Sequence, residues 1–304
     1  MRSLITGIQG FIGWHLSEFL KSNDHEVSGI QRVVKAPTDS SNIHECDMLD
    51  ETMLTELLRN IAPTVIFHLA AQSLPSVSWE SPENTLMTNV LSTLNLLKCI
   101  QKLRLDTRLV LFGSSSEYAP SIEPIREDSP LKPSSPYAVS KIASSLLSSL
   151  YYEAFGLDII IARPFFIIGP RKTHDVCSSL ARGIAKIESG HSGTLTVGNL
   201  KSIRDFLDVD DAVRAIWTMS QKGKSGEIYN ISSGIGTSIM SVLEILRSMA
   251  RTTIVTETIH ADNRKLDLPV VIGNNQKLRA LEWKPSVSLT ESLSRILDYW
   301  RDHT

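Results

Sequence analysis

Several features that mark specialised proteins are missing from the sequence. Its 304 residues include only 3 cysteines, and Cys46, Cys99 and Cys177 are odd in number and widely separated. We therefore expect reduced, buried thiols, no disulfide framework and no metal site. No apolar run reaches the roughly 18 residues of a membrane-spanning helix, and the N-terminus lacks the long apolar region and cleavage site of a signal peptide. These absences predict a cytoplasmic protein that does not associate with membranes.

A large excess of charge of either sign is also missing. The formal net charge is -2 and the isoelectric point is about 6.5, so there is no electrostatic reason to expect nucleic acid as a partner. What the sequence has is 42% hydrophobic and 21% charged residues, the balance of an ordinary globular protein with a large core. Its 304 residues suffice for about two domains.

The first half of the chain alternates short apolar runs with helical patterns. In order, these segments are residues 3–6, 11–22, 26–31, 51–60, 65–69, 83–103, 108–112, 136–155 and 158–162, after which Arg163-Pro164 is expected to stop the last run. Such alternation is typical of a parallel sheet with helices on both faces. We predict the α/β class: a Rossmann-type doubly wound parallel sheet with a smaller C-terminal α/β substrate domain.

The regular alternation ends after Pro164. Loops rich in glycine, serine and basic residues separate helical patterns near residues 178–187, 209–220, 239–249 and 289–299. We predict a first domain over residues 1–164, which also takes in short later segments near 205–235, and a second, smaller domain over 165–304. The cleft between them is the expected site.

A glycine turn follows the first apolar run and opens the first helical pattern. In Thr6-Gly7-Ile8-Gln9-Gly10-Phe11-Ile12-Gly13 the glycines allow a sharp turn and a close approach of backbone to a pyrophosphate, which the helix N-terminus attracts. A glycine-rich turn without a ligand is the simpler alternative. The GxxGxxG spacing points to the short-chain dehydrogenase/reductase superfamily. The residues predicted to bind the cofactor here are Gly7, Gln9, Gly10, Phe11, Ile12 and Gly13.

The segment after the second apolar run favours NADPH over NADH. A carboxylate on the adenosine ribose is usual where NAD is preferred, but Ser28-Gly29-Ile30-Gln31-Arg32 contains none. Arg32 is placed to pair with a 2′-phosphate, unless it is a solvated surface charge. NADH stays possible. Asp47 and Met48 are assigned to the adenine, with helix capping by Asp47 or Asp50 as the competing explanation.

Three residues form a candidate catalytic group. Tyr137 and Lys141 are four apart and share one helix face, and we expect the lysine ammonium to lower the pKa of the phenol toward working pH. Ser114, in Phe112-Gly113-Ser114-Ser115-Ser116, offers a hydroxyl to the same carbonyl oxygen. Each feature alone is more often an exposed surface or a loop. Together, downstream of the glycine turn, they indicate an acid/base site.

Nearly all of the chain resembles the extended short-chain dehydrogenase/reductases that act on nucleotide sugars, and is most similar to the branch of the GDP-mannose dehydratases and GDP-4-keto-6-deoxy-mannose reductases. The motifs that carry the resemblance are the glycine turn, His68-Leu69-Ala70-Ala71-Gln72, Asn89-Val90, Tyr137-Ala138-Val139-Ser140-Lys141, Ala162-Arg163-Pro164-Phe165, Ile168-Gly169-Pro170 and Arg204-Asp205-Phe206-Leu207-Asp208-Val209.

The resemblance implies that residues 1–164 form an NADP(H)-binding domain and residues 165–304 a nucleotide-sugar substrate domain. It also implies further site residues. Leu69, Ala70, Ala71 and Pro164 are assigned to the cofactor together with Tyr137 and Lys141. Arg204 and Arg264 match family positions on the diphosphate or ribose, with a surface arginine as the alternative for each. The residues implied to bind substrate are Ser73, Ser115, Ser116, Phe166, Val197, Arg204 and Arg264.

The resemblance also separates a reductase from a dehydratase. Dehydratases of this branch carry a glutamate two residues before the tyrosine that aligns with Tyr118, and that position here is Ser116. Glu117 is one residue off, and in an extended segment its side chain points to the opposite face. A one-residue slip, or a bulged loop, would restore a dehydratase-like pair. At the domain junction, relatives carry a polar pair where this chain has Phe166 and Ile167, which leaves the sugar and the base open.

We therefore expect reduction of the C4 ketone of a GDP-linked 4-keto-6-deoxy sugar, in deoxysugar and polysaccharide biosynthesis. Tyr137 protonates the alkoxide, Lys141 lowers the tyrosine pKa and holds the nicotinamide ribose, and Ser114 orients the carbonyl. The alternatives are a 4-epimerase, a 4,6-dehydratase and a non-catalytic dinucleotide sensor. Members of the family commonly dimerise through two helices, here those over 83–103 and 136–155, so a homodimer is expected.

Overall fold

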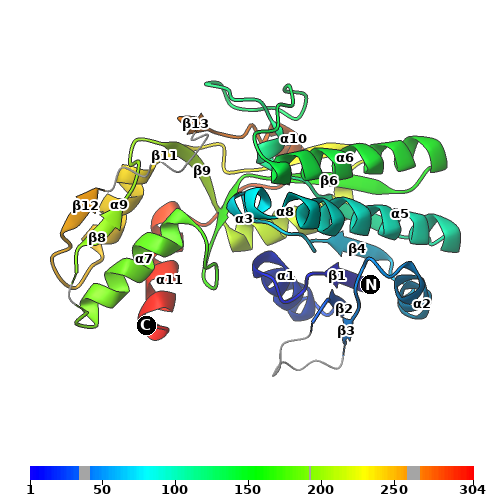
Figure 1. Cartoon of the computed structure of the whole chain (residues 1–304), viewed down its shortest axis with the longest axis horizontal. Coiled ribbons are helices and arrows are strands. Elements are labelled where there is room, and N and C mark those ends of the chain that lie inside the picture. Colours follow the sequence, from blue (N-terminus) through cyan, green and yellow to red (C-terminus); the bar gives the residue numbers. More distant parts are fainter. Residues whose placement is uncertain (34–41, 192, 259–267) are drawn as a thin grey trace.

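A seven-stranded parallel sheet forms the larger part of the molecule (Figure 1). The computed structural model describes residues 1–33, 42–191, 193–258 and 268–304. The strand order is β10-β6-β5-β4-β1-β2-β3, so the chain winds outward from β1 in both directions and the order reverses between β1 and β4. The strands are β1 (Arg2–Thr6), β2 (Glu26–Gln31), β3 (Ile43–Glu45), β4 (Val65–His68), β5 (Arg108–Phe112), β6 (Ile159–Pro164) and β10 (Ile228–Ile231). The predicted doubly wound fold class is confirmed.

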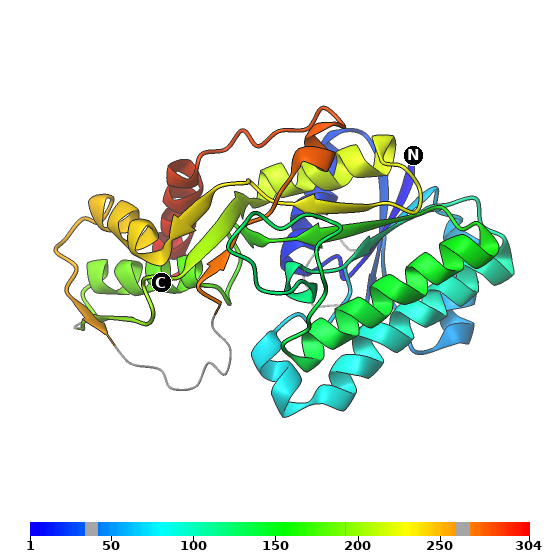
Figure 2. The same cartoon turned by 90° about the horizontal axis from the view of Figure 1, so that it is seen from above.

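Helices cover both faces of this sheet, as the two views show (Figures 1 and 2). Alternate residues of β4 face opposite sides: Phe67 packs in the core with α1 and α8, whereas Ile66 packs in the core with α2 and α5. Both faces are buried, which is why the central strands are continuously apolar rather than alternating. The helices are α1 (Phe11–Ser22), α2 (Glu51–Ile61), α5 (Ser92–Leu103), α6 (Pro136–Phe155) and α8 (Val209–Lys222).

The helical pattern over 83–103 is not one uniform helix. It contains α4 (Pro82–Leu86), a π-helical turn at Met87–Leu91 and then α5, and the short helix α3 (Pro75–Glu80) precedes it. A π turn often lies at a functional site because its extra residue redirects side chains. Here it carries Asn89, which is buried and contacts two parts of the site.

A smaller unit follows β6 and has its own core. Its strands are β7 (Phe166–Ile168), β8 (Leu195–Val197), β9 (Ile203–Asp208), β11 (Gly236–Ser238), β12 (Thr256–Thr258) and β13 (Val270–Val271). Its helices are α7 (Val176–Glu188), α9 (Ile239–Ser248) and α11 (Leu289–Asp302), and the short α10 (Gln276–Arg279) lies against β10. Between β9 and β11 the chain returns to the large sheet through α8 and β10.

One predicted boundary is wrong. Strand β6 was expected to stop before Arg163-Pro164 but runs through both residues, which pair in register with Asn230 and Ile231 of β10. Pro164 is the last residue of the strand, a position at which the missing N–H is tolerated. The chain then continues almost directly into β7, so the change from one unit to the other needs no linker.

Candidate active site

The glycine turn joins β1 to α1 in a conformation that side chains would prevent. Gly7 has a φ of 72°, and its N–H donates to the Ile30 carbonyl at 2.8 Å. A Cβ on Gly13 would lie 2.3 Å from the Gly7 oxygen. Helix α1 starts after Gly10 without a side-chain cap and without an acidic residue in its first turn. Its first N–H groups therefore suit an anionic ligand such as a pyrophosphate.

The predicted 2′-phosphate contact lies at the end of β2. Arg32 follows the strand and is exposed, and the loop after residue 33 lies outside the described residues. The side chain of Gln31 turns back toward the glycine turn, where its oxygen accepts the N–H of Gln9 at 3.4 Å. The structure thus places an exposed cation and no carboxylate within the segment 28–32, and the role of Arg32 stays a prediction.

Asp47 and Asp50 follow β3, and helix capping by either residue was the alternative to a contact of Asp47 with adenine. Asp50 is the N-cap of α2 and accepts the N–H of Met53 at 2.9 Å. Asp47 accepts the N–H of Leu49 at 3.0 Å, so it stabilises the turn before the helix. Met48 is buried beside them. Contacts of Asp47 and Met48 with adenine stay predictions.

His68 organises the segment after β4. Its ring contacts the Thr6 hydroxyl at 2.8 Å and the Thr93 hydroxyl at 3.0 Å, and burial lowers its pKa to about 3. The ring is therefore neutral and structural. Thr6 in turn accepts the N–H of Ala70 at 3.0 Å, which brings this segment against Gly7, whose Cβ would meet Ala70 at 3.0 Å. The backbone of residues 69–71, predicted to face the cofactor, thus lies beside the glycine turn.

Asn89 connects that segment to helix α6. Its amide oxygen accepts the N–H of Gln72 at 2.8 Å, and its amide nitrogen donates to the Gln72 carbonyl at 3.0 Å and the Ser140 hydroxyl at 2.8 Å. Ser73, predicted to contact substrate, follows Gln72 and is exposed. The π turn therefore sets the position of α6 relative to the carboxyl end of β4.

The structure brings the three predicted catalytic residues together. Helix α6 begins with Ser135 as its cap, and Tyr137 and Lys141 occupy successive turns of one face, 9% and 7% exposed. The Lys141 ammonium donates to the Phe112 carbonyl at 2.7 Å, at the end of β5. Ser114 follows that strand, and its side chain is near enough to the Tyr137 phenol to lower the pKa of that group.

The expected effect of the lysine on the tyrosine is wrong. Burial raises the pKa of Tyr137 to about 12, and the opposing influence is the hydrogen bond with Ser114 rather than Lys141. Burial also lowers the pKa of Lys141 to about 8. The ammonium lies 5.9 Å from the centre of the tyrosine ring and is hydrogen-bonded to a carbonyl. Tyr137 is thus a protonated group, suited to donating its proton.

The serine loop forms a 3-10 turn over Ser115–Glu117, not the extended segment that was assumed. The Ser114 oxygen accepts both the N–H of Ser116, at 3.1 Å, and its hydroxyl, at 2.8 Å. Both hydrogen-bond donors of Ser116 are therefore engaged with the Ser114 oxygen. The Glu117 carboxylate has no exposed surface and pairs with Arg163 at 2.8 Å. Our expectation that it does not replace the dehydratase glutamate agrees with this placement, although the reason is the turn and the ion pair.

The predicted substrate residues are only partly gathered. Phe166 in β7 is half-buried, and the Arg204 guanidinium of β9 lies 5.5 Å from the centre of its ring. Val197 is 3% exposed and packs in the core of the smaller unit, so its contact with substrate stays a prediction. Arg264 lies outside the described residues. Pro164 is half-buried at the end of β6.

The loop after β7 rests on α1, a contact that was not predicted. The Arg171 guanidinium lies 4.2 Å from the centre of the Trp14 ring, and the Lys172 ammonium lies 5.4 Å from that of Phe11. His15 contacts the Pro170 carbonyl at 3.2 Å. The Phe11 ring thus packs against this loop. The aromatic residues of α1 were the available signal, since one basic loop can pack on them.

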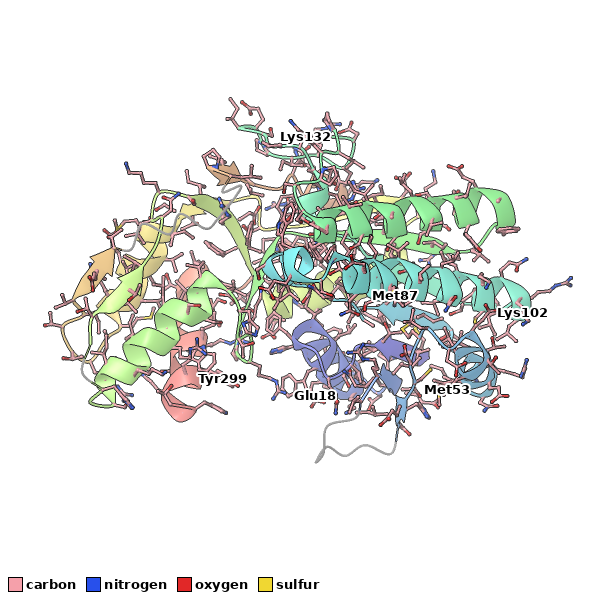
Figure 3. The ribbon with its side chains drawn as sticks, in the orientation of Figure 1. Glu18, Met53, Met87, Lys102, Lys132 and Tyr299 are labelled. Atoms are coloured by element: carbon pink, nitrogen blue, oxygen red, sulfur yellow. The ribbon has the colours of Figure 1, made fainter. Side chains whose placement is uncertain are left out.

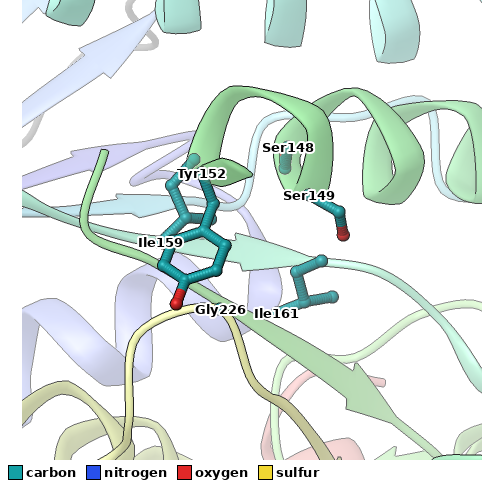
Figure 4. A pocket seen from close by; sticks show the side chains of 6 residues that line it. All are labelled: Ser148, Ser149, Tyr152, Ile159, Ile161 and Gly226. Atoms are coloured by element: carbon teal, nitrogen blue, oxygen red, sulfur yellow. The ribbon is translucent and has the colours of Figure 1, made fainter. Parts of the chain in front are cut away.

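Two surface hollows lie outside the catalytic group. One, shown in Figure 4, is formed by α6, β6 and Gly226 and has no room for a water molecule. The other, of about 420 Å³, is lined by β3 and α2. Within the described residues there is no group of three or more His, Cys, Asp and Glu side chains placed to hold a metal ion. No helix in that part of the chain is long and apolar enough to span a membrane.

Known proteins share both this sequence and this fold. Residues 4–296 match the family described as GDP-mannose 4,6 dehydratase. The GDP-6-deoxy-D-mannose reductase of Pseudomonas aeruginosa is 31% identical, covering 98% of this chain and 97% of the relative. A GDP-mannose 4,6-dehydratase of Vibrio cholerae is 32% identical, covering 80% of this chain and 70% of the relative.

A solved structure agrees with these matches. The structure described as RMD from Pseudomonas aeruginosa complexed with NADPH superposes with a TM-score of 0.87 at 31% identity, covering 100% of this chain and 99% of that one. The agreement extends over both units. The chain therefore belongs to the GDP-mannose 4,6 dehydratase family and is an enzyme of the nucleotide-sugar short-chain dehydrogenase/reductases.

Proposed function

We propose that the protein uses NADPH to reduce the C4 ketone of a nucleoside-diphosphate 4-keto-6-deoxy sugar, with GDP as the favoured nucleotide. The observation that carries the proposal is Ser116. At the position where dehydratases of this branch hold the glutamate that moves the C5 proton, this chain has a hydroxyl that donates to Ser114. Glu117, the neighbouring carboxylate, is committed to Arg163.

The similarity to named relatives supports the same choice. The Pseudomonas reductase is covered over 97% of its length, the Vibrio dehydratase over 70%. The solved Pseudomonas structure is a complex with NADPH. In this chain, the glycine turn, the uncapped start of α1 and the exposed Arg32 after β2 suit a phosphorylated dinucleotide. NADH is the weaker candidate.

We assign each residue a step in this reaction. NADPH, when bound, supplies a hydride, and the protein supplies position and protons. The Ser114 hydroxyl, whose oxygen accepts two bonds from Ser116, has its own proton left to donate to the ketone oxygen. The protonated phenol of Tyr137 gives its proton to that oxygen as negative charge develops. Lys141, held by the Phe112 carbonyl, is the residue that we assign to the nicotinamide ribose.

Purified protein distinguishes the candidate reactions. Mixed with NADPH and a dehydratase-generated GDP-4-keto-6-deoxy sugar, it should consume nicotinamide absorbance in a one-to-one ratio with the ketone. Tyr137→Phe should abolish turnover and still bind NADPH, because only the reacting oxygen is removed. Copurified NAD, with no loss of absorbance on any 4-keto sugar nucleotide, would instead identify an epimerase. Formation of a 4-keto product from GDP-mannose would identify a dehydratase.

We also propose that the enzyme is a cytoplasmic homodimer. Apolar side chains that were expected on the two long helical segments are exposed rather than in the core: Leu86, Met87 and Leu91 on the first, and Leu146 and Leu150 on the second. These segments run side by side, and Figure 3 labels Met87 on the first of them. Leu146 is 62% exposed and Leu150 is 55% exposed. Large apolar side chains exposed close together on one helix favour a contact with another protein surface over contact with solvent alone.

Oligomeric state in solution tests the dimer. Light scattering on the wild type should give twice the chain mass, and Leu146→Glu/Leu150→Glu should give the single-chain mass while keeping the circular dichroism spectrum of the folded chain, because neither side chain belongs to the core. Leu131→Glu, an exposed apolar residue outside both helices, is the matched control. A wild type of single-chain mass would refute the dimer.

A further inference from the structure

A buried ion pair lies next to the serine loop, and the proposed mechanism does not use it. Glu117 is fully buried and Arg163, in β6, is 3% exposed. One carboxylate oxygen, Oε2, accepts from Nε at 3.0 Å and Nη2 at 2.8 Å of the guanidinium. The same guanidinium lies 4.7 Å from the centre of the Tyr118 ring. A buried ion pair seldom stabilises a fold more than apolar residues of equal volume would, so its presence asks for another explanation.

The other carboxylate oxygen holds the catalytic loop. Oε1 accepts the N–H of Ser114 at 2.8 Å, and the Ser145 hydroxyl contacts the two oxygens at 3.3 and 3.2 Å. Ser145 lies one turn after Lys141 on α6. The pair therefore links the loop after β5, helix α6 and strand β6, which carry or adjoin all three predicted catalytic residues.

The surroundings leave little freedom for this arrangement. A Cβ on Gly113 would lie 2.4 Å from Glu117 Oε1 and 3.2 Å from the Arg163 side chain. The glycine thus provides the space that the carboxylate fills. Arg163 Nη1 also contacts the Glu127 carbonyl at 3.4 Å, in the loop that covers the pair. The Glu127 carboxylate itself accepts the N–H of Asn230.

We propose that Glu117 and Arg163 are positioning residues for the reaction. The pair holds the backbone of Ser114 so that its hydroxyl meets the ketone oxygen, and it places a fixed negative charge near Lys141. The inference rests on the proposed function for the identity of the substrate only. The positioning itself concerns Ser114 and Lys141 in any reaction that these residues perform.

The charges around Lys141 determine the sign of the expected effect. Glu117 raises the pKa of Lys141 against the larger lowering by burial. Arg163 faces Glu117 from β6, neutral His68 faces Lys141 from β4, and the protonated phenols of Tyr137 and Tyr118 complete the titratable groups. Without the carboxylate charge, the unopposed Arg163 also disfavours the ammonium, so Lys141 should lose its proton at lower pH.

Glu117→Gln is the direct test, because the amide keeps the shape but has one acceptor oxygen, whereas Ser114 and Arg163 each use a different oxygen of the carboxylate. We expect kcat to fall about 10- to 100-fold, the usual effect of removing a residue that orients a reactive group. The alkaline limb of the pH profile should move to lower pH by about one unit. NADPH affinity should not change. Glu188→Gln is the matched control, because it removes the carboxylate of the half-buried Glu188–Arg301 pair in the smaller unit.

A second variant addresses folding. Should Glu117→Gln unfold, Glu117→Gln/Arg163→Met removes both charges together and avoids an unpaired guanidinium. This variant should fold, lose kcat because Ser114 is held less firmly, and show a smaller pH shift than the single variant. Wild-type kcat in a folded double variant would overturn the positioning role.

A measurement without substrate separates this inference from the proposed function. The ¹³Cε resonance of Lys141, assigned by its absence in Lys141→Met, reports the lysine pKa directly. Removal of the carboxylate should lower that pKa. The comparison is Glu117→Gln with the wild type or, if Glu117→Gln unfolds, the double variant with Arg163→Met alone. An unchanged lysine pKa and an unmoved pH profile would refute the electrostatic part, whatever the substrate. A wild type that never consumes NADPH would refute the proposed function and leave this result standing.

Discussion

Replacing Gly13 by alanine tests the glycine turn more sharply than any other change. The added Cβ would lie 2.3 Å from the Gly7 oxygen and 2.9 Å from Ile8 Cα, and ordinary contact begins at 3.4 Å, so backbone atoms must separate by about 1 Å. Neither neighbour is the end of a flexible side chain. Overpacking of this kind costs about 1–3 kcal/mol, and the better helix propensity of alanine within α1 returns about 1 kcal/mol.

The larger effect should fall on the cofactor. A shift of about 1 Å moves the N–H groups that are to meet the pyrophosphate, and we expect NADPH to bind at least about tenfold more weakly, or about 1.4 kcal/mol. Titration of NADPH fluorescence measures the affinity and thermal unfolding measures the stability. Gly193→Ala is the matched control, since its Cβ would meet nothing within 4 Å. Wild-type affinity in Gly13→Ala would refute the assignment of this turn to the cofactor.

Three further predictions concern ionisable groups. Reductase activity should fall as pH rises through the pKa of Lys141, about 8, because the ammonium is then lost, and a pH profile of kcat checks this. His68 has a native pKa of about 3, below its unfolded value of 6.5. Its contribution to stability is therefore present above pH 6.5 and is lost as pH falls toward 3, by about 1.4 kcal/mol per pH unit. His68→Gln should flatten this pH dependence of the unfolding free energy, measured by urea unfolding, and an unchanged slope would contradict the neutral ring. Asp205 accepts from the N–H groups of Ser233, Gly234 and Gly273, so Asp205→Ala should lower the unfolding free energy by about 2–5 kcal/mol, whereas a loss below about 0.5 kcal/mol would show that these bonds are dispensable.

Local patterns were enough to predict the larger unit. Helix α1 and strand β5 begin and end at the predicted residues, and α6 spans the predicted 136–155. These segments have long periodic patterns, clear caps or continuous apolar runs, which act over a few residues. The smaller unit was predicted less well, because its strands β8, β11 and β13 have 3, 3 and 2 residues. Such strands exist only through their pairing with distant segments.

The residues of the site were predicted better than their interactions. Tyr137 and Lys141 were assigned from their spacing together with Ser114 and the glycine turn, yet the expected lowering of the tyrosine pKa was wrong, because burial raises it. Glu117 was judged from an assumed extended segment, whereas a 3-10 turn carries it inward to Arg163. Charge and burial at one residue depend on groups far away in the chain, and a local pattern contains no record of them.

By itself, then, the sequence determined the fold class and predicted the cofactor turn and the catalytic group, because each depends on residue types at short spacings. Tertiary structure alone decided which carboxylate is free and which is paired, that Ser116 acts on Ser114, and that apolar residues of the two long helical segments are exposed. The physical reason is that hydrogen bonds, desolvation and packing act across space, between strands and helices that the chain brings together only when it folds.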